Sequence, residues 1–267
     1  MNTAEPLLSI RVAVDYPQRP RVLRDVSFDM QRGEVLGLVG QSGSGKSTIA
    51  LAIMRLLSMK GGTATGSIHF EGRDLLQLPE RELRKIRGRD IGLVLQSPLS
   101  SLNPALRIRK QLMEAWSAHS DGKTEASAVI EEAMQSVSLP SDDDFLKRFP
   151  SEVSVGQAQR VLIAMAILHH PALLIADEAT SALDVITQAE IMQLFAHLNR
   201  ERQMAILYIS HDLLSVNRIC DRIAILHDGE IVECASTSLI FTDPKHPYTR
   251  RLLAAIPERP KLLYESI

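Results

Sequence analysis

The chain reads Gly40-Gln41-Ser42-Gly43-Ser44-Gly45-Lys46-Ser47-Thr48 between the apolar run Val35–Val39 and a helix-compatible segment. Its glycines let the backbone bend so that successive N–H groups point at one anion, and the positive end of the following helix adds to the attraction. We expect Lys46 to reach the β- and γ-phosphates of a nucleotide and Ser47 to hold Mg²⁺. A Gly/Ser-rich turn would look similar but leaves the lysine at the helix start unexplained. The stretch therefore predicts a phosphate-binding loop.

The composition is that of an ordinary globular protein. The 267 residues can bury a sizeable core in one large domain or in a domain with a subdomain. Lys plus Arg number 30 against 32 Asp plus Glu, so no basic field exists to attract nucleic acid, and no nucleic-acid partner is expected. Cys220 and Cys234 are far apart and lack a C-x-x-C partner, which predicts reduced structural thiols and neither a zinc site nor a disulfide framework.

The sequence predicts neither a secretory signal nor a membrane span. Residues 1–8 carry Glu5 and lack a basic region followed by an apolar core. The longest apolar candidate, residues 161–168, is well short of the ~20 residues that a spanning helix needs. Any role at a membrane is therefore expected to come through a partner.

Strand and helix patterns predict an α/β fold. Short strands at 7–14 and 22–28, with Pro17 and Pro20 marking the turn between them, suggest a small β layer ahead of the loop. Apolar residues at helical spacing predict two amphipathic helices between about 105 and 138. Beyond residue 173, apolar strands alternate with helices, which implies a mostly parallel sheet covered on both faces.

Polar residues follow three of the apolar strands. Asp177 and Glu178 end the strand that starts at Leu173, where Asp177 can join the Mg²⁺ shell and Glu178 can act as general base on the attacking water. A surface helix-capping pair would look the same, but the phosphate loop makes catalysis the better interpretation. His211 and Gln96 end two further strands, so His211 could contact the γ-phosphate or orient the water, and Gln96 could bind Mg²⁺ or water.

Taken together, these motifs resemble the ATP-binding subunit of an ABC transporter, and the resemblance covers nearly the whole chain. The motifs stand in the family's order: the phosphate loop at 40–48, Gln96, the signature-like segment Val153-Ser154-Val155-Gly156-Gln157, the strand ending in Asp177-Glu178, the segment Ser181-Ala182-Leu183-Asp184, and Ser210-His211.

The resemblance implies an α/β P-loop NTPase core with an N-terminal antiparallel β layer and an inserted helical subdomain. We divide the chain into an ATP-binding core (1–96 and 161–235), a helical subdomain with the signature segment (97–160) and a C-terminal tail (236–267). ATP and Mg²⁺ are the implied cofactors, and Tyr16 would stack on the adenine, although a half-buried strand aromatic is the alternative.

The family works as a dimer in which ATP lies between the phosphate loop of one subunit and the signature segment of the other. Ser154, Gly156, Gln157 and Asp184 would then contact nucleotide held by the partner. The family signature is usually Leu-Ser-Gly-Gly-Gln, so Val155 departs from it where glycine is expected. A β-branched residue there restricts the backbone and adds bulk. We therefore expect a heterodimer with unequal sites. Ala179 also replaces a common proline, which leaves the adjacent carboxylates intact.

Two further stretches look like the dipeptide, oligopeptide and nickel importer group: residues 96–104 and the more specific His246-Pro247-Tyr248-Thr249-Arg250. The implied function is ATP hydrolysis that powers uptake of peptides, nickel or a related small solute. The implied partners are two membrane permeases, a second ATPase subunit and, indirectly, an extracytoplasmic substrate-binding protein. The chain would sit peripherally on the cytoplasmic face of the inner or plasma membrane.

Other functions share parts of this pattern. The ATPase-like component of a soluble phosphonate-processing complex has the same tail. A low-turnover ATP-binding regulatory subunit is favoured by Val155 and opposed by Glu178. A soluble ABC ATPase of DNA repair or translation usually needs coiled-coil arms, zinc ligands or tandem ATPase domains, and the sequence has none of these.

Overall fold

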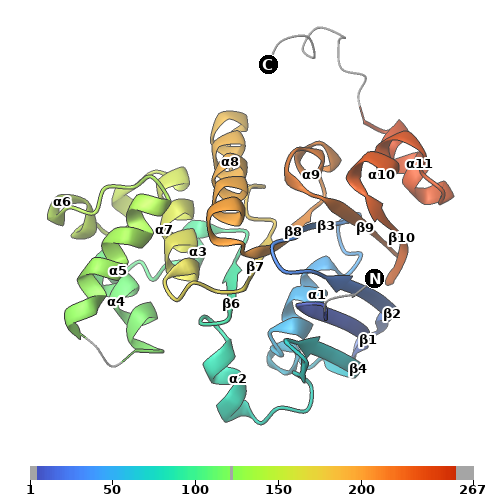
Figure 1. Cartoon of the computed structure of the whole chain (residues 1–267), viewed down its shortest axis with the longest axis horizontal. Helices are drawn as coiled ribbons and strands as arrows, with labels where there is room; N and C mark the ends of the chain where they lie inside the picture. Colours follow the sequence, from blue (N-terminus) through green and yellow to red (C-terminus); the bar gives the residue numbers. More distant parts are fainter. Residues whose placement is uncertain (1–4, 121–122, 257–267) are drawn as a thin grey trace, which may run out of the picture.

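The computed structural model describes residues 5–120 and 123–256. A six-stranded sheet of order β10-β9-β3-β8-β7-β6 forms its centre (Figure 1). Neighbouring strands are parallel from β9 to β6, and β10 pairs with β9 antiparallel. The strands are β3 (Val35–Val39), β6 (Ile91–Val94), β7 (Leu173–Asp177), β8 (Ala205–Ser210), β9 (Arg222–His227) and β10 (Glu230–Ser236). The predicted mostly parallel sheet is confirmed.

A second, antiparallel sheet of order β2-β1-β4-β5 confirms the predicted β layer. One detail of the prediction is wrong, because Pro20 lies inside a strand and the turn consists of Pro17 and Gln18. The strand that contains Pro20 is at the edge of its sheet, where a missing N–H removes no ladder hydrogen bond. The strands are β1 (Leu8–Tyr16), β2 (Arg19–Met30), β4 (Thr63–Phe70) and β5 (Arg73–Asp74).

The central sheet is buried on both faces, as its apolar strands require. Along β3, Leu36 and Leu38 join a core with α1 (Lys46–Ile53) and the antiparallel sheet. Val35 and Val39 alternate with them and join a second core with α7 (Val155–Ile167), α8 (Val185–Arg202) and α9 (Leu213–Ile219). Figure 1 shows α8 and α9 on one side of the sheet and α1 on the other. This arrangement places the carboxyl ends of β3, β7 and β8 at one edge.

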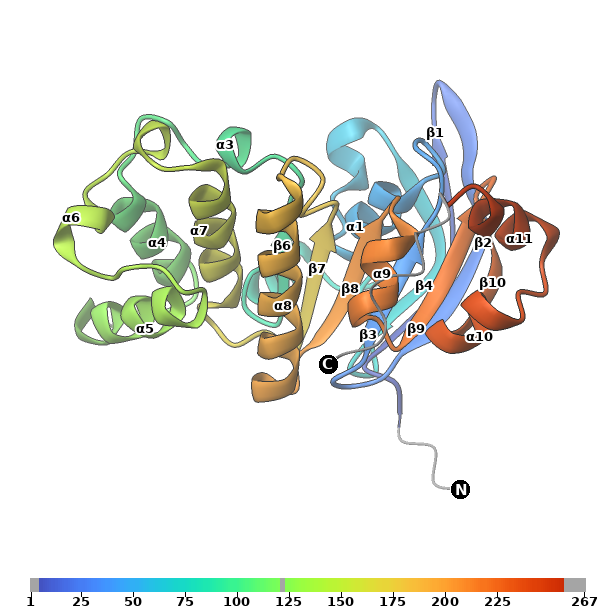
Figure 2. The same cartoon turned by 90° about the horizontal axis from the view of Figure 1, so that it is seen from above.

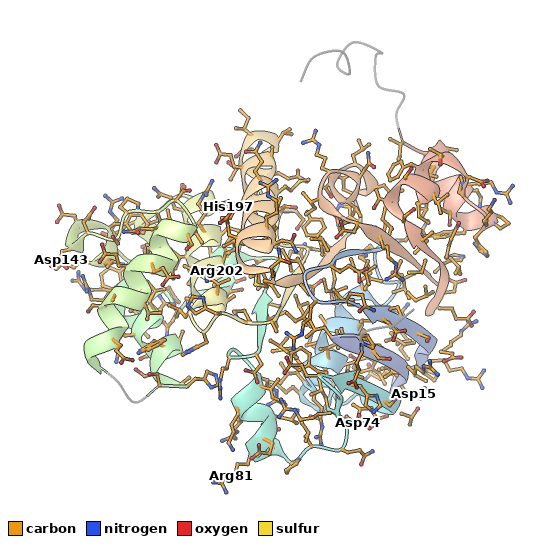
Figure 3. The ribbon with its side chains drawn as sticks, in the orientation of Figure 1. Asp15, Asp74, Arg81, Asp143, His197 and Arg202 are labelled. Carbon is orange, nitrogen blue, oxygen red and sulfur yellow. The ribbon has the colours of Figure 1, made fainter. Side chains whose placement is uncertain are left out.

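Helices α3 to α7 form a lobe beside the edge strand β6, with α7 packed against α3, α4, α5 and β6 (Figure 2). The two helices predicted between 105 and 138 are α4 and α5. Arg202 of α8, labelled in Figure 3, fastens the lobe by donating hydrogen bonds to Glu132 Oε1 (3.0 Å) and Ser136 Oγ (2.9 Å) of α5. The lobe contains α3 (Pro98–Ser101), α4 (Ile108–Ser117), α5 (Lys123–Ser136), α6 (Asp143–Leu146), the 3₁₀ turn Pro150–Glu152 and α7.

The remaining helices lie around the two sheets, and the last two, α10 and α11, pack at the end opposite the lobe (Figure 2). They are the 3₁₀ turn Leu57–Lys60, α2 (Glu80–Ile86), α10 (Thr237–Thr242) and α11 (Pro247–Ala254). The division proposed from the sequence sets a boundary at residue 160, which falls inside α7; that division stays a prediction. Its tail extends to residue 267, and residues 257–267 lie outside the described part.

Two smaller expectations concern the cysteines and the membrane. Cys220 and Cys234 are both free thiols, and burial raises the pKa of Cys220 well above its ordinary value. The apolar stretch 161–168 lies largely within α7, whose apolar face fills the core. Within the described ranges, no helix has the length and apolar character that crossing a bilayer requires.

Candidate nucleotide-binding site

The loop 40–48 connects the end of β3 to the start of α1. Gly43 and Gly45 have φ values of +77° and +108°, which a residue with a Cβ rarely adopts. Gly45 precedes α1, and no side chain among the described residues caps that helix. Ser44 Oγ is buried and likewise has no hydrogen-bond partner in the described structure. Uncapped N–H groups and an unpartnered hydroxyl fit an anion such as a phosphate.

Lys46 is buried, with 4% of its surface exposed. Its Nζ donates hydrogen bonds to the carbonyl oxygens of Gly40 (2.9 Å) and Gln41 (3.0 Å). The same Nζ lies 3.6 Å from Glu178 Oε1. A buried ammonium needs such acceptors to offset its desolvation. The loop thus holds its own cation against its carbonyl groups, next to a carboxylate.

Ser47 and Asp177 form the second pair at this edge of the sheet. Ser47 Oγ donates a hydrogen bond to Asp177 Oδ1 at 3.0 Å. Burial raises the pKa of Asp177 above its ordinary value, and the hydrogen bond from Ser47 opposes that rise. A hydroxyl and a carboxylate are oxygen ligands of the kind that Mg²⁺ prefers, and a cation here would offset the buried negative charge. The pair therefore fits the predicted Mg²⁺ site.

Glu178 follows β7 directly and lies between two other strand ends. Its carboxylate is 3.6 Å from Lys46 Nζ through Oε1 and 3.4 Å from His211 Nδ1 through Oε2. Its backbone N–H donates to the carbonyl of Ile209 in β8 (3.0 Å). The backbone of Glu178 is left-handed, with φ of +49°. The ends of β3, β7 and β8 thus bring the predicted lysine, glutamate and histidine together.

A cavity of about 300 Å³ opens beside the loop. Gln96, which follows β6 after one intervening residue, lines this cavity together with the loop, as its position at a strand end predicts. Arg19 also lines it, and its Nη2 donates a hydrogen bond to the carbonyl of Gly43 (3.1 Å). Sequence reasoning missed Arg19. The available signal was a basic residue directly after the hairpin turn at 17–18. The cavity is lined by Arg19, Val22, Ser42, Gly43, Gly45, Lys46, Ser47, Thr48, Gln96 and Glu178.

Tyr16 lines a neighbouring cavity of about 440 Å³, which shares Arg19, Val22 and Thr48 with the first. The ring of Tyr16 lies against Gly62, where an added Cβ would be 2.6 Å from Tyr16 Cε1. An aromatic wall next to a cationic, anion-binding cavity suits a base joined to a phosphate chain. The stacking role of Tyr16 stays a prediction.

The signature-like segment builds the start of α7. Ser154 caps this helix: its Oγ accepts the Gln157 N–H (3.1 Å), and Gln157 Oε1 accepts the Ser154 N–H (3.0 Å). Gly156 lies against α8, because a Cβ there would be 2.7 Å from Thr187 Cγ2. Within the described part of the chain, Ser154, Gly156 and Gln157 do not line the cavity at the phosphate loop. The structure therefore does not bring them to the loop of the same chain.

Asp184 and Val155 lie at this same end of α7 and α8. Asp184 caps α8, with Oδ1 accepting the N–H groups of Ile186 and Thr187 (3.0 Å each), and the hydrogen bonds from Thr187 lower its pKa. Val155 is the first residue of α7 and is 39% exposed. Val155 has a helical backbone conformation, which a β-branched residue can adopt. The expected restriction of the backbone at Val155 is therefore absent, and only the bulk of its side chain remains. Val185 and Ile186 add exposed apolar surface nearby.

Two family models match the chain. The model described as "ABC transporter" matches residues 23–181. The model described as "Oligopeptide/dipeptide transporter, C-terminal region" matches residues 232–264. The first includes the loop, Gln96, the signature-like segment and the carboxylate pair. The second includes the stretch 246–250.

Curated relatives include three transport proteins. The chain is 43% identical to the oligopeptide transport ATP-binding protein OppD of Bacillus subtilis, over 91% of this chain and 68% of OppD. It is 45% identical to the peptidoglycan transport ATP-binding protein YejF of Agrobacterium fabrum, over 96% of this chain and 48% of YejF. It is 42% identical to the glutathione import ATP-binding protein GsiA of Escherichia coli K12, over 90% of this chain and 40% of GsiA. The chain thus spans less than half of YejF and GsiA.

Solved structures share the fold. The ATP-binding cassette MJ0796, in a dimer bound to ADP and Pi, superposes with a TM-score of 0.73 at 27% identity, covering 86% of this chain and 98% of that one. CbiO1 of Clostridium perfringens superposes with a TM-score of 0.77 at 22% identity, covering 95% of this chain and 97% of CbiO1. At this identity the likeness supports only the assignment of the fold. With a family model that spans more than half of its residues, the chain belongs to the ABC transporter family.

Proposed function

We propose that the chain is an ATP-hydrolysing subunit that powers import of peptides, nickel or a related small solute through two partner membrane permeases. The observation that carries this proposal is the meeting of Lys46, Ser47, Asp177 and Glu178 at one sheet edge beside a cavity. The C-terminal match and the transport names of the relatives support import over the soluble phosphonate-processing complex. The subunit would attach to the cytoplasmic face of the membrane through the permeases.

The residues of the loop would bind the triphosphate. Lys46 and the loop N–H groups neutralise phosphate charge that grows at the oxygens during transfer. Ser47 and Asp177, with Gln96 across the cavity, would hold Mg²⁺, which when bound supplies further charge neutralisation on the phosphates. Tyr16 would receive the adenine in the neighbouring cavity.

Glu178 would be the general base for the attacking water. Its position 3.6 Å from Lys46 makes it the counter-ion of the lysine when no phosphate is bound. When a γ-phosphate replaces Glu178 as the ionic partner of Lys46, the Glu178 carboxylate becomes available to accept a proton from water. His211, 3.4 Å from the other carboxylate oxygen, would orient the glutamate and the water.

We infer that the active assembly is a heterodimer of two ATPase subunits, beneath an extracytoplasmic substrate-binding protein. Ser154, Gly156, Gln157 and Asp184 gather away from the loop of their own chain, as a role opposite a partner's nucleotide requires. Unequal sites would follow from the bulk of Val155. Replacing the catalytic glutamate singly in each subunit tests this, since equal residual hydrolysis rates would contradict it.

The variant Val155→Gly should raise ATP turnover of the assembled complex. Relief of about 1 kcal/mol of crowding at the partner's phosphates corresponds to about fivefold in rate. Val155→Ala removes most of the bulk while keeping helix propensity, so it should reach an intermediate rate. Steady-state ATPase assays on the three complexes measure this. Identical rates for all three would make the departure from the family signature neutral.

Affinity purification of the full chain from native membranes, followed by Mg²⁺-dependent ATPase assays, tests the proposed function. We expect two permeases and a second ATPase subunit with an unaltered signature to copurify, and the complex to hydrolyse ATP. A soluble phosphonate-processing complex in their place would overturn the proposal. A membrane complex that binds ATP without turnover would instead support the regulatory alternative.

A further inference from the structure

The stretch His246–Arg250 takes no part in the site described above, yet it is firmly anchored. The N–H groups of Lys245 and His246 donate to the Glu233 carboxylate of β10 at 2.7 and 3.0 Å. Burial alone would raise the pKa of Glu233, but the nearby Thr249 side chain and the hydrogen bonds from these two amides bring it below its ordinary value. His246 caps α11 by accepting the Tyr248 N–H at Nδ1 (3.2 Å). The start of α11 is thereby fixed to the edge of the central sheet.

Tyr248 of α11 stacks on His227, with ring centroids 3.6 Å apart and planes within 12°. His227 ends β9, which runs parallel to β3 with Ile225 opposite Val39. The end of β9 therefore lies beside the start of the phosphate loop. The contact is close, because a Cβ at Gly40 would be 2.4 Å from the carbonyl oxygen of Leu226. The end of β9 thus packs against both the phosphate loop and α11.

The side chain of Tyr248 shares a cavity with the loop residue Gln41. Tyr248 is 4% exposed, and its Oη is buried with no hydrogen-bond partner in the described structure. Burial raises the pKa of Tyr248, and the backbone N–H of Gln41 opposes that rise. Gln41, His227, Tyr248 and Arg251 also line one cavity of about 310 Å³. A buried, unpartnered hydroxyl costs free energy, so packing alone would favour phenylalanine here.

The Gly40–Gln41 peptide, whose N–H belongs to the residue that shares this cavity with Tyr248, also helps to hold the lysine. The carbonyl groups of Gly40 and Gln41 each accept a hydrogen bond from Lys46 Nζ, and Gln41 O also accepts the Ser44 N–H (3.2 Å). A shift of this peptide therefore moves the Lys46 ammonium and the loop together. Positioning errors of this kind weaken phosphate binding even when every ligand-binding residue is present.

We propose that Tyr248 is a positioning residue of the phosphate loop: its ring rests on His227, its hydroxyl accepts the Gln41 N–H when phosphate binds, and the Gly40–Gln41 peptide is thereby held in place. The inference rests on the proposed ATPase function for its effect on turnover. It links the C-terminal stretch to nucleotide affinity in the same chain, and it requires no contact between Tyr248 and ATP.

The test compares Tyr248→Phe, Tyr248→Ala and the control Arg250→Ala in the full chain. Arg250 is exposed on the same helix and donates to the carbonyl of Lys245. We expect Tyr248→Phe to raise KM for ATP, and the amide exchange rate of residues 40–48 measured with nucleotide bound, by about three- to tenfold, as the loss of one hydrogen bond predicts. The value of kcat should change less than about twofold, and the ligand-free Tm should be unchanged or higher. Tyr248→Ala should enlarge both effects, and Arg250→Ala should show neither.

If Tyr248→Phe matches the wild type in KM and in loop exchange, Tyr248 only packs and the inference is wrong. If exchange rises but the wild-type complex hydrolyses no ATP, the positioning role stands and the proposed function fails. A lower Tm for Tyr248→Phe with unchanged loop exchange would indicate a general structural role and would likewise overturn the inference.

Discussion

Lys46→Ala should abolish productive ATP binding, raising the Kd for ATP at least about a hundredfold. The Lys46 ammonium is buried between two loop carbonyl groups and the Glu178 carboxylate, so its loss removes the central cation from the cavity. The phosphates would then meet Glu178 with no intervening positive charge. Titration with a fluorescent ATP analogue measures the effect on the purified chain.

The matched control for this variant is Lys85→Ala. Lys85 is exposed on α2 and pairs with Glu82 in the same helix, so its loss should leave ATP affinity within about twofold of the wild type. Circular dichroism should show that both variants keep the fold. ATP binding by Lys46→Ala within about threefold of the wild type would refute the assignment of this lysine to the phosphates.

Glu178→Gln should lower kcat by about a hundred- to ten-thousandfold while ATP binding is retained. The amide keeps the size of the side chain but cannot accept a proton from water at neutral pH. Because the amide also no longer competes as the counter-ion of Lys46, ATP affinity should stay equal or increase. The assembly is therefore expected to accumulate as a closed dimer loaded with ATP, which size-exclusion chromatography with bound-nucleotide analysis can detect.

Glu131→Gln provides the control, since Glu131 is exposed on α5 and accepts a hydrogen bond from Gln135 of the same helix. Its kcat should equal that of the wild type. Normal hydrolysis by Glu178→Gln would show that another group activates the water. Of the residues predicted here, His211 would then be the next to test.

The central part of the site is predictable from sequence because its signals are local. A glycine-rich turn before a lysine, and carboxylates directly after an apolar strand, each occupy fewer than ten residues. Parallel strands then bring their carboxyl ends to one edge, which places Lys46, Asp177 and Glu178 together without further information. The same reasoning located Gln96 and His211.

Other features were missed although the sequence carried a signal. Ser154 and Gln157 have the spacing of a capping box, which marks the start of α7. The segment was interpreted for its resemblance to a signature, and the helix start it encodes was overlooked. Pro20 was assigned to a turn because proline is a strong turn signal, but an edge strand tolerates it equally.

The contact of Tyr248 with His227 and the loop had no usable sequence signal. It depends on how α11 docks against the end of β9, and such docking follows from the fit of many side chains on segments far apart in the chain. For Arg19 the sequence shows a basic residue beside a turn, but its contact with the Gly43 carbonyl depends on the conformation of the hairpin. Long side chains in turns can point in several directions that local patterns do not distinguish.

The left-handed backbone at Glu178 lowers the folding stability at the position where the carboxylate is needed for the reaction. With φ of +49°, a residue bearing a Cβ is disfavoured there by about 1 kcal/mol relative to glycine. A glycine at this position would relieve that strain, but it would also remove the carboxylate beside the buried Lys46 ammonium, so the two effects on stability oppose each other. Backbone strain at a carboxylate beside the phosphate loop is the kind of strain that is maintained at functional sites.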